Sequence, residues 1–338
     1  MKGFKLIKPF NLEEKELAET ENTAACTKAR ITKALVTLSD VLCYRGDIDC
    51  ESVVLGSSGI GVVSETEANL FGLEKGKHIY IEPCKECGEC YNCKNREYDK
   101  CLDRLIAGED YDGFLSDFMS VPHEKLFVLP ESVSDFEALF IDHISLAVAV
   151  VDKLGVQKGD YVAILGANNF GNILAQLLIY YQAVPIVLTT DDEDDEIAKK
   201  SGVYYVLGKD DNWQKEVASI TSGRMADKTV FIYESDIPIV KAFALSSFNA
   251  AVAITGVTSG SISISFTQAI KKQLDILCIN NGFGNAASAI NLIANKAVNL
   301  SQLKLDSAPY ESVPETFKTL SDEYEKTGKI HETVIDLI

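Results

Sequence analysis

The residues best suited to chemistry are cysteines gathered in one short stretch. The chain has nine cysteines, and five of them lie between Cys84 and Cys101. Cys87, Cys90, Cys93 and Cys101 are separated by two, two and seven residues, and a compact loop with this spacing can wrap its sulfurs around one tetrahedral zinc ion. Four thiolates leave no position for water or substrate, so the predicted zinc is structural. An iron–sulfur cluster or free thiols are the alternatives, and Cys84 is a spare thiol that could replace one ligand.

A second candidate site follows the buried strand YVAIL. Residues 166–171 read GANNFG and precede a helix, which fits a dinucleotide-binding turn whose helix N-terminus faces the pyrophosphate. Gly166 and Gly171 take the outer glycine positions of this turn. Asn168 stands at the middle position, where a side chain crowds the phosphates. We therefore expect either a nucleotide site or a Rossmann domain whose pocket is empty.

The end of the next strand bears on the choice of coenzyme. An acidic residue is expected there to bind the ribose hydroxyls, but the residue at this position is Thr189. Asp191, two residues further on, could substitute. The acidic run 191–196 would repel a 2′-phosphate, so NAD is preferred to NADP if either binds.

The elements that must position these residues change in character along the chain. Residues 25–130 are strand-like, with short apolar runs punctuated by Gly, Asp and Glu. From about residue 136, strands alternate with helices of about 10 to 15 residues, a pattern that predicts βαβ units and a parallel sheet. The predicted fold class is therefore α/β.

The composition narrows the range of partners. With 32 basic and 50 acidic side chains the net charge is −18, which argues against nucleic acid and against an anionic membrane surface. Apolar residues make up 46 % of the chain, too many for a largely disordered protein. The uncharged stretches 161–190 and 242–270 contain polar residues that fit packed strands and helices better than a membrane span. No signal peptide is visible, so we expect a cytoplasmic protein with reduced thiols.

Together these residues resemble the zinc-type medium-chain dehydrogenase/reductase family, in its alcohol, sorbitol and threonine dehydrogenase branch. The cysteine lobe 84–101 matches the family's structural zinc loop, and KLGVQKGDYVAILGANNFG resembles the entry to its coenzyme domain. The resemblance implies a GroES-like β-barrel domain (residues 1–140 and 296–338) and a Rossmann doubly wound parallel-sheet domain (residues 141–295). It also implies oxidoreductase activity with NAD on a small-molecule substrate, in a homodimer or homotetramer.

The resemblance also assigns the catalytic zinc ligands, and most of them are missing. The family's catalytic cysteine falls on Thr37, its zinc-binding histidine on Ser57, and the remaining ligand on Asp142, which alone could bind metal. Two hydroxyls and one carboxylate make a poor zinc site, and without zinc no Lewis acid polarises a carbonyl. Ser39 keeps the family's proton-relay hydroxyl, but Leu42 stands where the relay histidine is usual.

Three functions are compatible with this pattern. A zinc-independent NAD oxidoreductase would use the hydroxyl groups of Thr37, Ser39, Ser57 and Ser58 as hydrogen-bond donors to an activated carbonyl or enone. A catalytically inactive pseudo-dehydrogenase, acting as a binding or regulatory protein, would keep the structural zinc because it stabilises the fold. A dehydrogenase with relocated zinc ligands would draw on the neighbouring Cys43, Cys50, Asp142 and His143.

Overall fold

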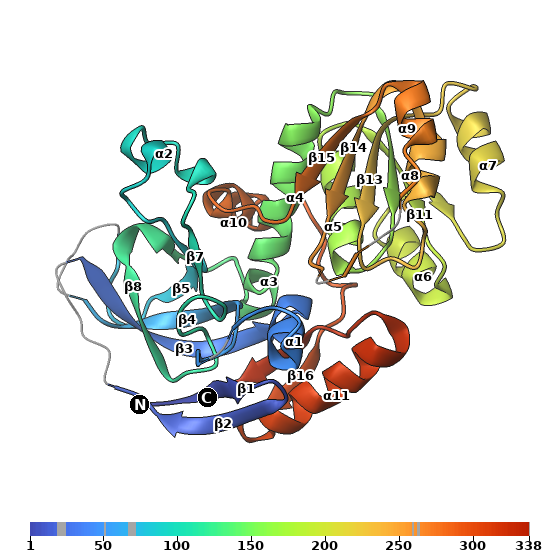
Figure 1. Ribbon diagram of the computed structural model, residues 1–338. Helices are drawn as coiled ribbons and strands as arrows, with labels where there is room; N and C mark the ends of the chain where they lie inside the picture. The colour runs from blue at the N-terminus through green and yellow to red at the C-terminus, as the bar shows by residue number, and fades with distance from the viewer. Residues whose placement is uncertain (19–24, 51, 67–71, 259, 262–263, 338) are drawn as a thin grey trace. The chain divides into compact units, whose positions relative to one another are not determined.

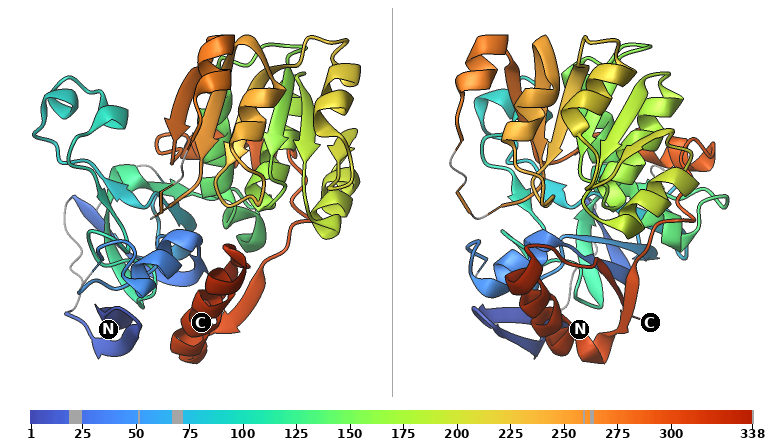
Figure 2. Two further views of the ribbon diagram at one scale, coloured as in Figure 1. Left: turned by 45° about the vertical axis from the view of Figure 1, so that its right-hand side comes forward. Right: turned by 90° about the vertical axis from the view of Figure 1, so that its right-hand side faces the viewer.

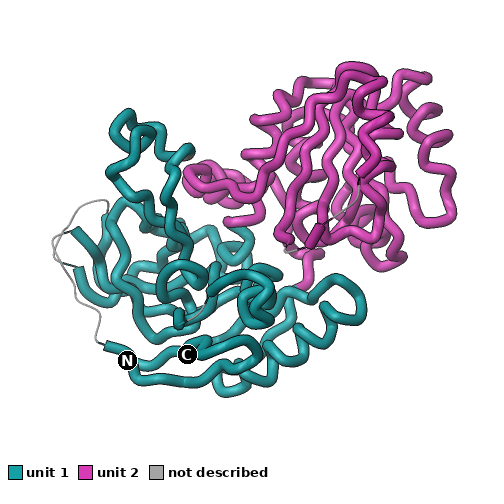
Figure 3. Tube along the Cα trace, viewed as in Figure 1, with its two compact units in different colours: residues 1–141, 305–338 teal, residues 142–304 magenta. Residues whose placement is uncertain are grey.

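The computed structural model describes residues 1–18, 25–50, 52–66, 72–258, 260–261 and 264–337. The chain divides into two compact units (Figure 3): unit 1 is Met1–Ile141 with Leu305–Ile338, and unit 2 is Asp142–Lys304. Each unit has its own sheet and its own cluster of buried apolar side chains. The candidate sites are therefore held by two separate scaffolds.

Unit 2 is built on a parallel sheet of six strands in the order β12-β11-β10-β13-β14-β15. These strands are β10 (Tyr161–Leu165), β11 (Val184–Leu188), β12 (Tyr205–Leu207), β13 (Ala226–Ile232), β14 (Ser246–Thr255) and β15 (Asp275–Ile279). Residues 162–165 of β10 are completely buried, as expected for a sheet covered on both faces. The chain moves outward from β10 to β12 and returns to β13, so the strand order reverses between β10 and β13. The predicted α/β class with a doubly wound parallel sheet is confirmed.

Helices connect these strands and lie on both faces of the sheet (Figures 1 and 2). They are α4 (Ile141–Leu154), α5 (Asn169–Tyr180), α6 (Asp192–Lys200), α7 (Trp213–Ile220), α8 (Val240–Leu245), α9 (Thr267–Lys272) and α10 (Ala286–Ala294). α5 packs against β10 and β11, and its residues 170–178 are buried. This packing fixes the N-terminus of α5 at the end of β10.

The segment 296–304 groups with unit 2, although the resemblance placed it in the first domain. Gln176 of α5 bonds to both backbone groups of Asn299: Nε2 donates to the carbonyl at 3.1 Å, and the amide donates to Oε1 at 2.6 Å. Val298, Leu300 and Leu303 are buried. Long-range bonds to α5, which a local sequence pattern does not reveal, hold this segment.

Unit 1 is built on a mainly antiparallel sheet of seven strands. They follow the order β16-β17-β3-β4-β5-β9, with β8 paired to β3. The strands are β3 (Cys26–Val36), β4 (Ser58–Glu65), β5 (His78–Ile81), β8 (Phe118–Pro122), β9 (Leu126–Val128), β16 (Asp306–Pro309) and β17 (Thr333–Asp336). Two further antiparallel pairs are β1 (Lys2–Lys8) with β2 (Asn11–Glu16), and β6 (Cys84–Lys85) with β7 (Leu105–Ile106).

The helices of unit 1 are short except at the C-terminal end. They are α1 (Leu38–Arg45), α2 (Tyr91–Lys94), α3 (Asp135–Ala138) and α11 (Val313–Thr327), with 3₁₀ turns η1 (Tyr98–Lys100), η2 (His123–Lys125) and η3 (Tyr310–Ser312). α1 is buried over residues 38–44 and packs against α11, where the rings of Tyr44 and Phe317 lie 5.5 Å apart. The start of α1 is therefore held firmly. Within the described part of the chain, no helix is both long and apolar enough to cross a membrane.

Candidate functional site

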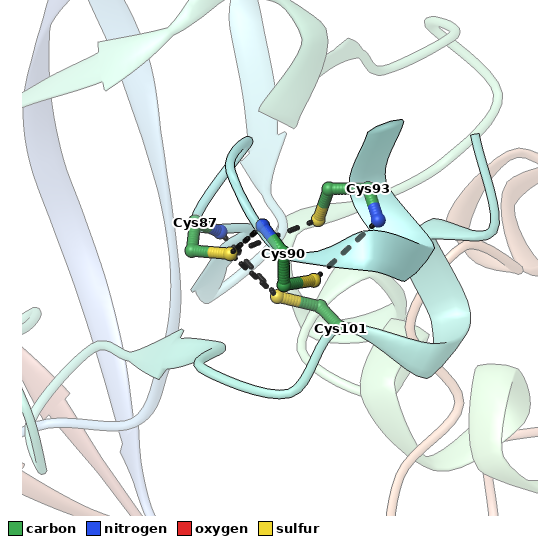
Figure 4. Close-up of side chains that lie close together, drawn as sticks. All are labelled: Cys87, Cys90, Cys93 and Cys101. Atoms are coloured by element: carbon green, nitrogen blue, oxygen red, sulfur yellow. Dashed lines mark hydrogen bonds between the residues drawn. The ribbon is translucent and has the colours of Figure 1, made fainter. Parts of the chain in front are cut away.

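The four predicted zinc ligands converge in one loop of unit 1 (Figure 4). Cys87 follows β6, Cys90 caps the N-terminus of α2, Cys93 lies within α2, and Cys101 follows η1. Their four sulfur atoms all lie within 4.8 Å of one another. The pairing of β6 with β7 closes the base of the loop, so backbone hydrogen bonds hold its two ends together.

The sulfur positions fit a tetrahedral zinc ion. Zn–S bonds of about 2.3 Å place tetrahedral sulfurs about 3.8 Å apart, and Cys87 Sγ lies 3.6 Å from Cys101 Sγ and 3.9 Å from Cys93 Sγ. Backbone amides also point at the sulfurs: Cys90 N lies 3.3 Å from Cys87 Sγ, and Cys87 N lies 3.4 Å from Cys101 Sγ. The donor set fits the predicted closed structural site, where zinc supplies folding free energy.

The thiol pKa values show why this cluster needs a cation. Hydrogen bonds from the backbone amides of Leu102 and Cys93 lower the pKa of Cys90 to about 6. Burial and the neighbouring sulfurs raise the pKa of Cys93 to about 12. Four thiolates therefore coexist only when a bound cation offsets their mutual repulsion.

Cys84, the spare thiol, belongs to a different cluster. Its sulfur is buried 3.4 Å from Lys125 Nζ, and that ammonium also donates to Glu82 Oε2 and Glu86 Oε1, at 2.8 Å each. Burial raises the pKa of Cys84 to about 12. Burial lowers the pKa of Lys125, but the hydrogen bonds to the two carboxylates outweigh it and the net shift is upward. Cys84 is thus a neutral thiol beside a buried ion pair and does not replace a zinc ligand.

The three hydroxyl residues at the family's catalytic positions lie together in unit 1. Thr37 precedes α1, Ser39 lies in the first turn of that helix, and Ser57 directly precedes β4. Ser57 Oγ lies 3.1 Å from Thr37 Oγ1 and 3.3 Å from Ser39 Oγ. The hydroxyls of Thr37 and Ser39 lie 3.4 Å apart. The structure thus brings these three residues into one cluster.

A buried carboxylate, which the sequence analysis did not single out, organises these hydroxyls. Asp40 is only 1 % exposed. Its Oδ2 accepts from Thr37 N at 2.9 Å, Thr37 Oγ1 at 3.1 Å and Ser57 Oγ at 3.0 Å, while Oδ1 accepts from Gly56 N at 3.2 Å. Burial raises the pKa of Asp40 against the lowering effect of these bonds. Because Thr37 and Ser57 direct their protons at Asp40, Ser39 is the hydroxyl whose proton does not go to the carboxylate, and it donates to Ser57 Oγ.

A second carboxyl group, Glu109, lies beside the same cluster. The loop that carries it approaches the backbone of Gly56 so closely that a Cβ on Gly108 would lie 2.7 Å from the Gly56 carbonyl oxygen. Burial and the charge of Asp40 raise the pKa of Glu109, while a hydrogen bond with Ser39 lowers it, and the net shift is upward. Glu109 therefore keeps its proton to a higher pH than an ordinary glutamate.

The relocated zinc site is not formed among the described residues. In this part of the chain the four lobe cysteines are the only group of three or more His, Cys, Asp and Glu side chains whose ligand atoms gather closely. Cys43 and Cys50 are joined in a disulfide, so the expectation of reduced thiols is wrong for this pair, and neither sulfur is open to a metal. Asp142 and His143 lie in the first turn of α4, in unit 2, whereas the hydroxyl cluster belongs to unit 1.

In unit 2, the turn after β10 resembles a dinucleotide-binding turn except at position 168. Gly166 has a φ of 118°, and a Cβ there would lie 3.0 Å from Ser235 Cβ, so glycine is required. Asn168 Oδ1 accepts from Gly171 N at 3.0 Å and caps α5. Asn168 Nδ2 donates to Glu234 Oε2 at 3.1 Å. The strand, Gly166 and the helix N-terminus fit a dinucleotide-binding turn. Asn168 stands at the position of the middle glycine, where its side chain takes up space that a glycine leaves open.

Thr189 and Asp191 lie at the end of β11, where a ribose-binding acid is expected. The amide of Asp191 donates to Thr189 Oγ1 at 3.0 Å. Asp191 Oδ1 caps α6, accepting from Glu193 N at 2.8 Å and Asp194 N at 3.4 Å. The second oxygen of Asp191 takes no part in these cap bonds. A role of Asp191 toward a ribose stays a prediction.

Comparison with known proteins shows what the chain is similar to. Residues 27–131 match the alcohol dehydrogenase GroES-like domain. An uncharacterized zinc-type alcohol dehydrogenase-like protein of Haemophilus influenzae is 24 % identical over 336 residues, 98 % of each chain. L-threonine 3-dehydrogenase of Pyrococcus abyssi is 29 % identical over 221 residues, 64 % of this chain and 63 % of its own. An alcohol dehydrogenase from Escherichia coli, solved with NADH, has a TM-score of 0.84 at 22 % identity, covering 100 % of this chain and 99 % of its own.

Over nearly its whole length the chain is similar to a zinc-type alcohol dehydrogenase-like protein, and part of it matches the GroES-like domain of alcohol dehydrogenases. These similarities confirm the predicted resemblance and fold, and the relatives are a zinc-type alcohol dehydrogenase-like protein, a D-xylulose reductase and an L-threonine 3-dehydrogenase. The cysteine cluster has the donor set for the predicted zinc, and NADH is the cofactor in the structure of the Escherichia coli protein. The sequence analysis missed Asp40, Glu109 and Glu234. A signal existed only for Asp40, because Thr37 and Asp40 have the spacing of a capping box.

Replacing one lobe cysteine tests the zinc site. We expect Cys101→Ser to lose the single zinc equivalent per chain and to lower the free energy of unfolding by more than about 4 kcal/mol, because metal binding is coupled to folding. Cys84→Ser is the matched control and should keep one zinc. Metal analysis by mass spectrometry and urea denaturation measure the two effects. Zinc retained in Cys101→Ser and lost in Cys84→Ser would contradict the ligand assignment.

Removing the buried ammonium tests the cluster around Cys84. Lys125→Met leaves two carboxylates without their cation, and Glu82 and Glu86 have side chains only 5 % and 16 % exposed. We expect the free energy of unfolding to fall by about 3 to 5 kcal/mol, as measured by chemical denaturation. Adding Glu82→Gln and Glu86→Gln to this variant should recover part of the loss. A change below about 1 kcal/mol would show that the pair is not a buried one.

Proposed function

We propose that the chain is an NAD(H)-dependent oxidoreductase that keeps a structural zinc and works without a catalytic zinc. Its substrate is an activated carbonyl or enone, because the hydroxyl groups of Thr37 and Ser57 are poor zinc ligands and an ordinary carbonyl would need a Lewis acid to polarise it. The observation that carries this proposal is the cluster of Thr37, Ser39 and Ser57 around the buried carboxylate of Asp40. Thr37 and Ser57 occupy positions at which the family resemblance places zinc ligands, and Ser39 occupies the position of the proton-relay hydroxyl.

The directions of the hydrogen bonds in the cluster give its members different roles. Asp40 receives the hydroxyl protons of Thr37 and Ser57 and so fixes their orientation. Ser39, whose hydroxyl donates to Ser57 Oγ, would redirect this proton to an oxyanion as charge develops there. Protonated Glu109 can donate to Ser39 Oγ while Ser39 passes its own proton outward. A bound dinucleotide would supply the hydride, and this relay would supply the proton that turns the alkoxide of a reduced carbonyl into the alcohol or the enolate of a reduced enone into the ketone.

A specific observation also favours the alternative of a catalytically inactive pseudo-dehydrogenase. Asn168 and Glu234 stand bonded to each other at the N-terminus of α5, where a coenzyme pyrophosphate is expected. In that alternative the structural zinc and the fold serve binding or regulation of another molecule. Under either function, the cytoplasmic location and the homo-oligomeric state stay predictions.

Titration with coenzyme separates these two functions. Purified chain is titrated with NADH and NADPH while nucleotide fluorescence is followed, and hydride transfer to activated carbonyls and enones is then assayed. Saturable NADH binding with turnover supports the oxidoreductase. The absence of binding at about 1 mM, an affinity of only about −4 kcal/mol, would favour the pseudo-dehydrogenase. One zinc per chain is expected in both cases.

The pH dependence of reduction tests Glu109 as the proton donor. Its pKa is raised, so the protonated form persists above the ordinary glutamate range and is lost as the pH rises through the folded-state pKa. We expect kcat for reduction to fall across that pH range, and Glu109→Gln to lower kcat about a hundredfold and flatten this limb. Glu131→Gln, at an exposed position, is the control and should keep the wild-type profile. An unaltered profile in Glu109→Gln would contradict the assignment.

A further inference from the structure

Glu234 lies beside the point of the unit 2 sheet at which the strand order reverses. It follows β13 by two residues, and β13 is the neighbour of β10 at which the strand order reverses. In open α/β sheets, ligands bind outside the carboxyl ends of the strands at this switch point. A carboxylate is an unusual group to find there in a protein that binds a dinucleotide, because the pyrophosphate is itself negatively charged.

The carboxylate is held in place from both sides. Its Oε2 accepts from Asn168 Nδ2 at 3.1 Å, and its Oε1 faces the backbone amide of Val257, after β14, at 3.5 Å. The same segment packs closely on the turn after β10, where a Cβ on Gly166 would lie 3.0 Å from Ser235 Cβ and 3.2 Å from Ile232 Cβ. Glu234 is therefore fixed against the turn by its neighbours in the chain.

Asn168 links this carboxylate to the helix. One end of its amide caps α5 by accepting from Gly171 N, and the other end donates to Glu234. A helix N-terminus carries partial positive charge and attracts anions. The chain's own carboxylate is thus bonded to the cap residue at the position where the phosphates of a dinucleotide would bind.

We propose that Glu234 limits coenzyme affinity by competing with the pyrophosphate for the N-terminus of α5, so that ligands carrying a pyrophosphate bind weakly until this carboxylate is displaced. The inference rests on the proposed function, since it concerns the same dinucleotide site. In this inference Glu234 selects ligands by their charge, a role that is separate from the chemistry at Ser39 and Glu109.

The test compares the zinc-loaded full-length wild type with Glu234→Gln, which keeps the shape of the side chain and removes its charge. Dissociation constants are measured for NADH by fluorescence, and for ADP-ribose and adenosine by calorimetry. We expect the constants for NADH and ADP-ribose, which share the pyrophosphate, to fall at least about tenfold in the variant. The constant for adenosine, which has no phosphate, should stay within about twofold.

Glu216→Gln, in the first turn of α7, is the matched control and should bind all three ligands as the wild type does. Thermal unfolding of each variant shows that the fold is kept. NADH constants that agree within about twofold between wild type and Glu234→Gln would overturn the inference and leave the oxidoreductase proposal standing. Equal tightening for adenosine would also overturn it, because charge would not be the cause. If neither protein binds NADH at about 1 mM, the inference and the dinucleotide part of the proposed function both fail.

Discussion

The buried carboxylate of Asp40 is the interaction on which the candidate site depends. A carboxylate taken out of water is costly unless hydrogen bonds replace its hydration, and four donors from Thr37, Gly56 and Ser57 do so here. These donors come from two segments, the start of α1 and the approach to β4. The carboxylate therefore fastens the two segments to each other, and the hydroxyl geometry follows from that connection.

The two clusters of unit 1 show opposite ways of stabilising negative charge. In the cysteine lobe, burial and the neighbouring sulfurs raise the pKa of Cys93, so a full set of thiolates requires a cation. Around Asp40, backbone amides and hydroxyls supply the compensation, so the cluster is complete without a metal. In the proposed function, Thr37 and Ser57 stand in for a thiolate and an imidazole, and hydrogen bonds take the place of a metal ion. Such a site would retain acid–base chemistry but not Lewis acidity.

The sequence predicted those features that local spacing determines. The zinc loop follows from the spacing of Cys87 to Cys101, and the doubly wound sheet follows from alternating strand and helix patterns. Glu109 could not be found this way, because the close packing of Gly108 on Gly56 brings it beside Ser39 across a long stretch of chain. The bonds from Gln176 to residue 299 and the disulfide of unit 1 are long-range or orientation-dependent in the same sense. Neither has a periodic pattern that would predict it.

The coenzyme turn illustrates how stability and binding compete for the same donors. A glycine at position 168 would leave the first amides of α5 open to a phosphate, whereas Asn168 satisfies one of them internally and stabilises the helix by about 1 kcal/mol. The same side chain then presents its amide nitrogen outward, and a carboxylate becomes a favourable neighbour. Asn168 and Glu234 thus stabilise each other, and side chains of the turn itself satisfy these hydrogen-bonding groups. A ligand that binds there must replace an existing set of hydrogen bonds, so its affinity reflects a difference between two satisfied states.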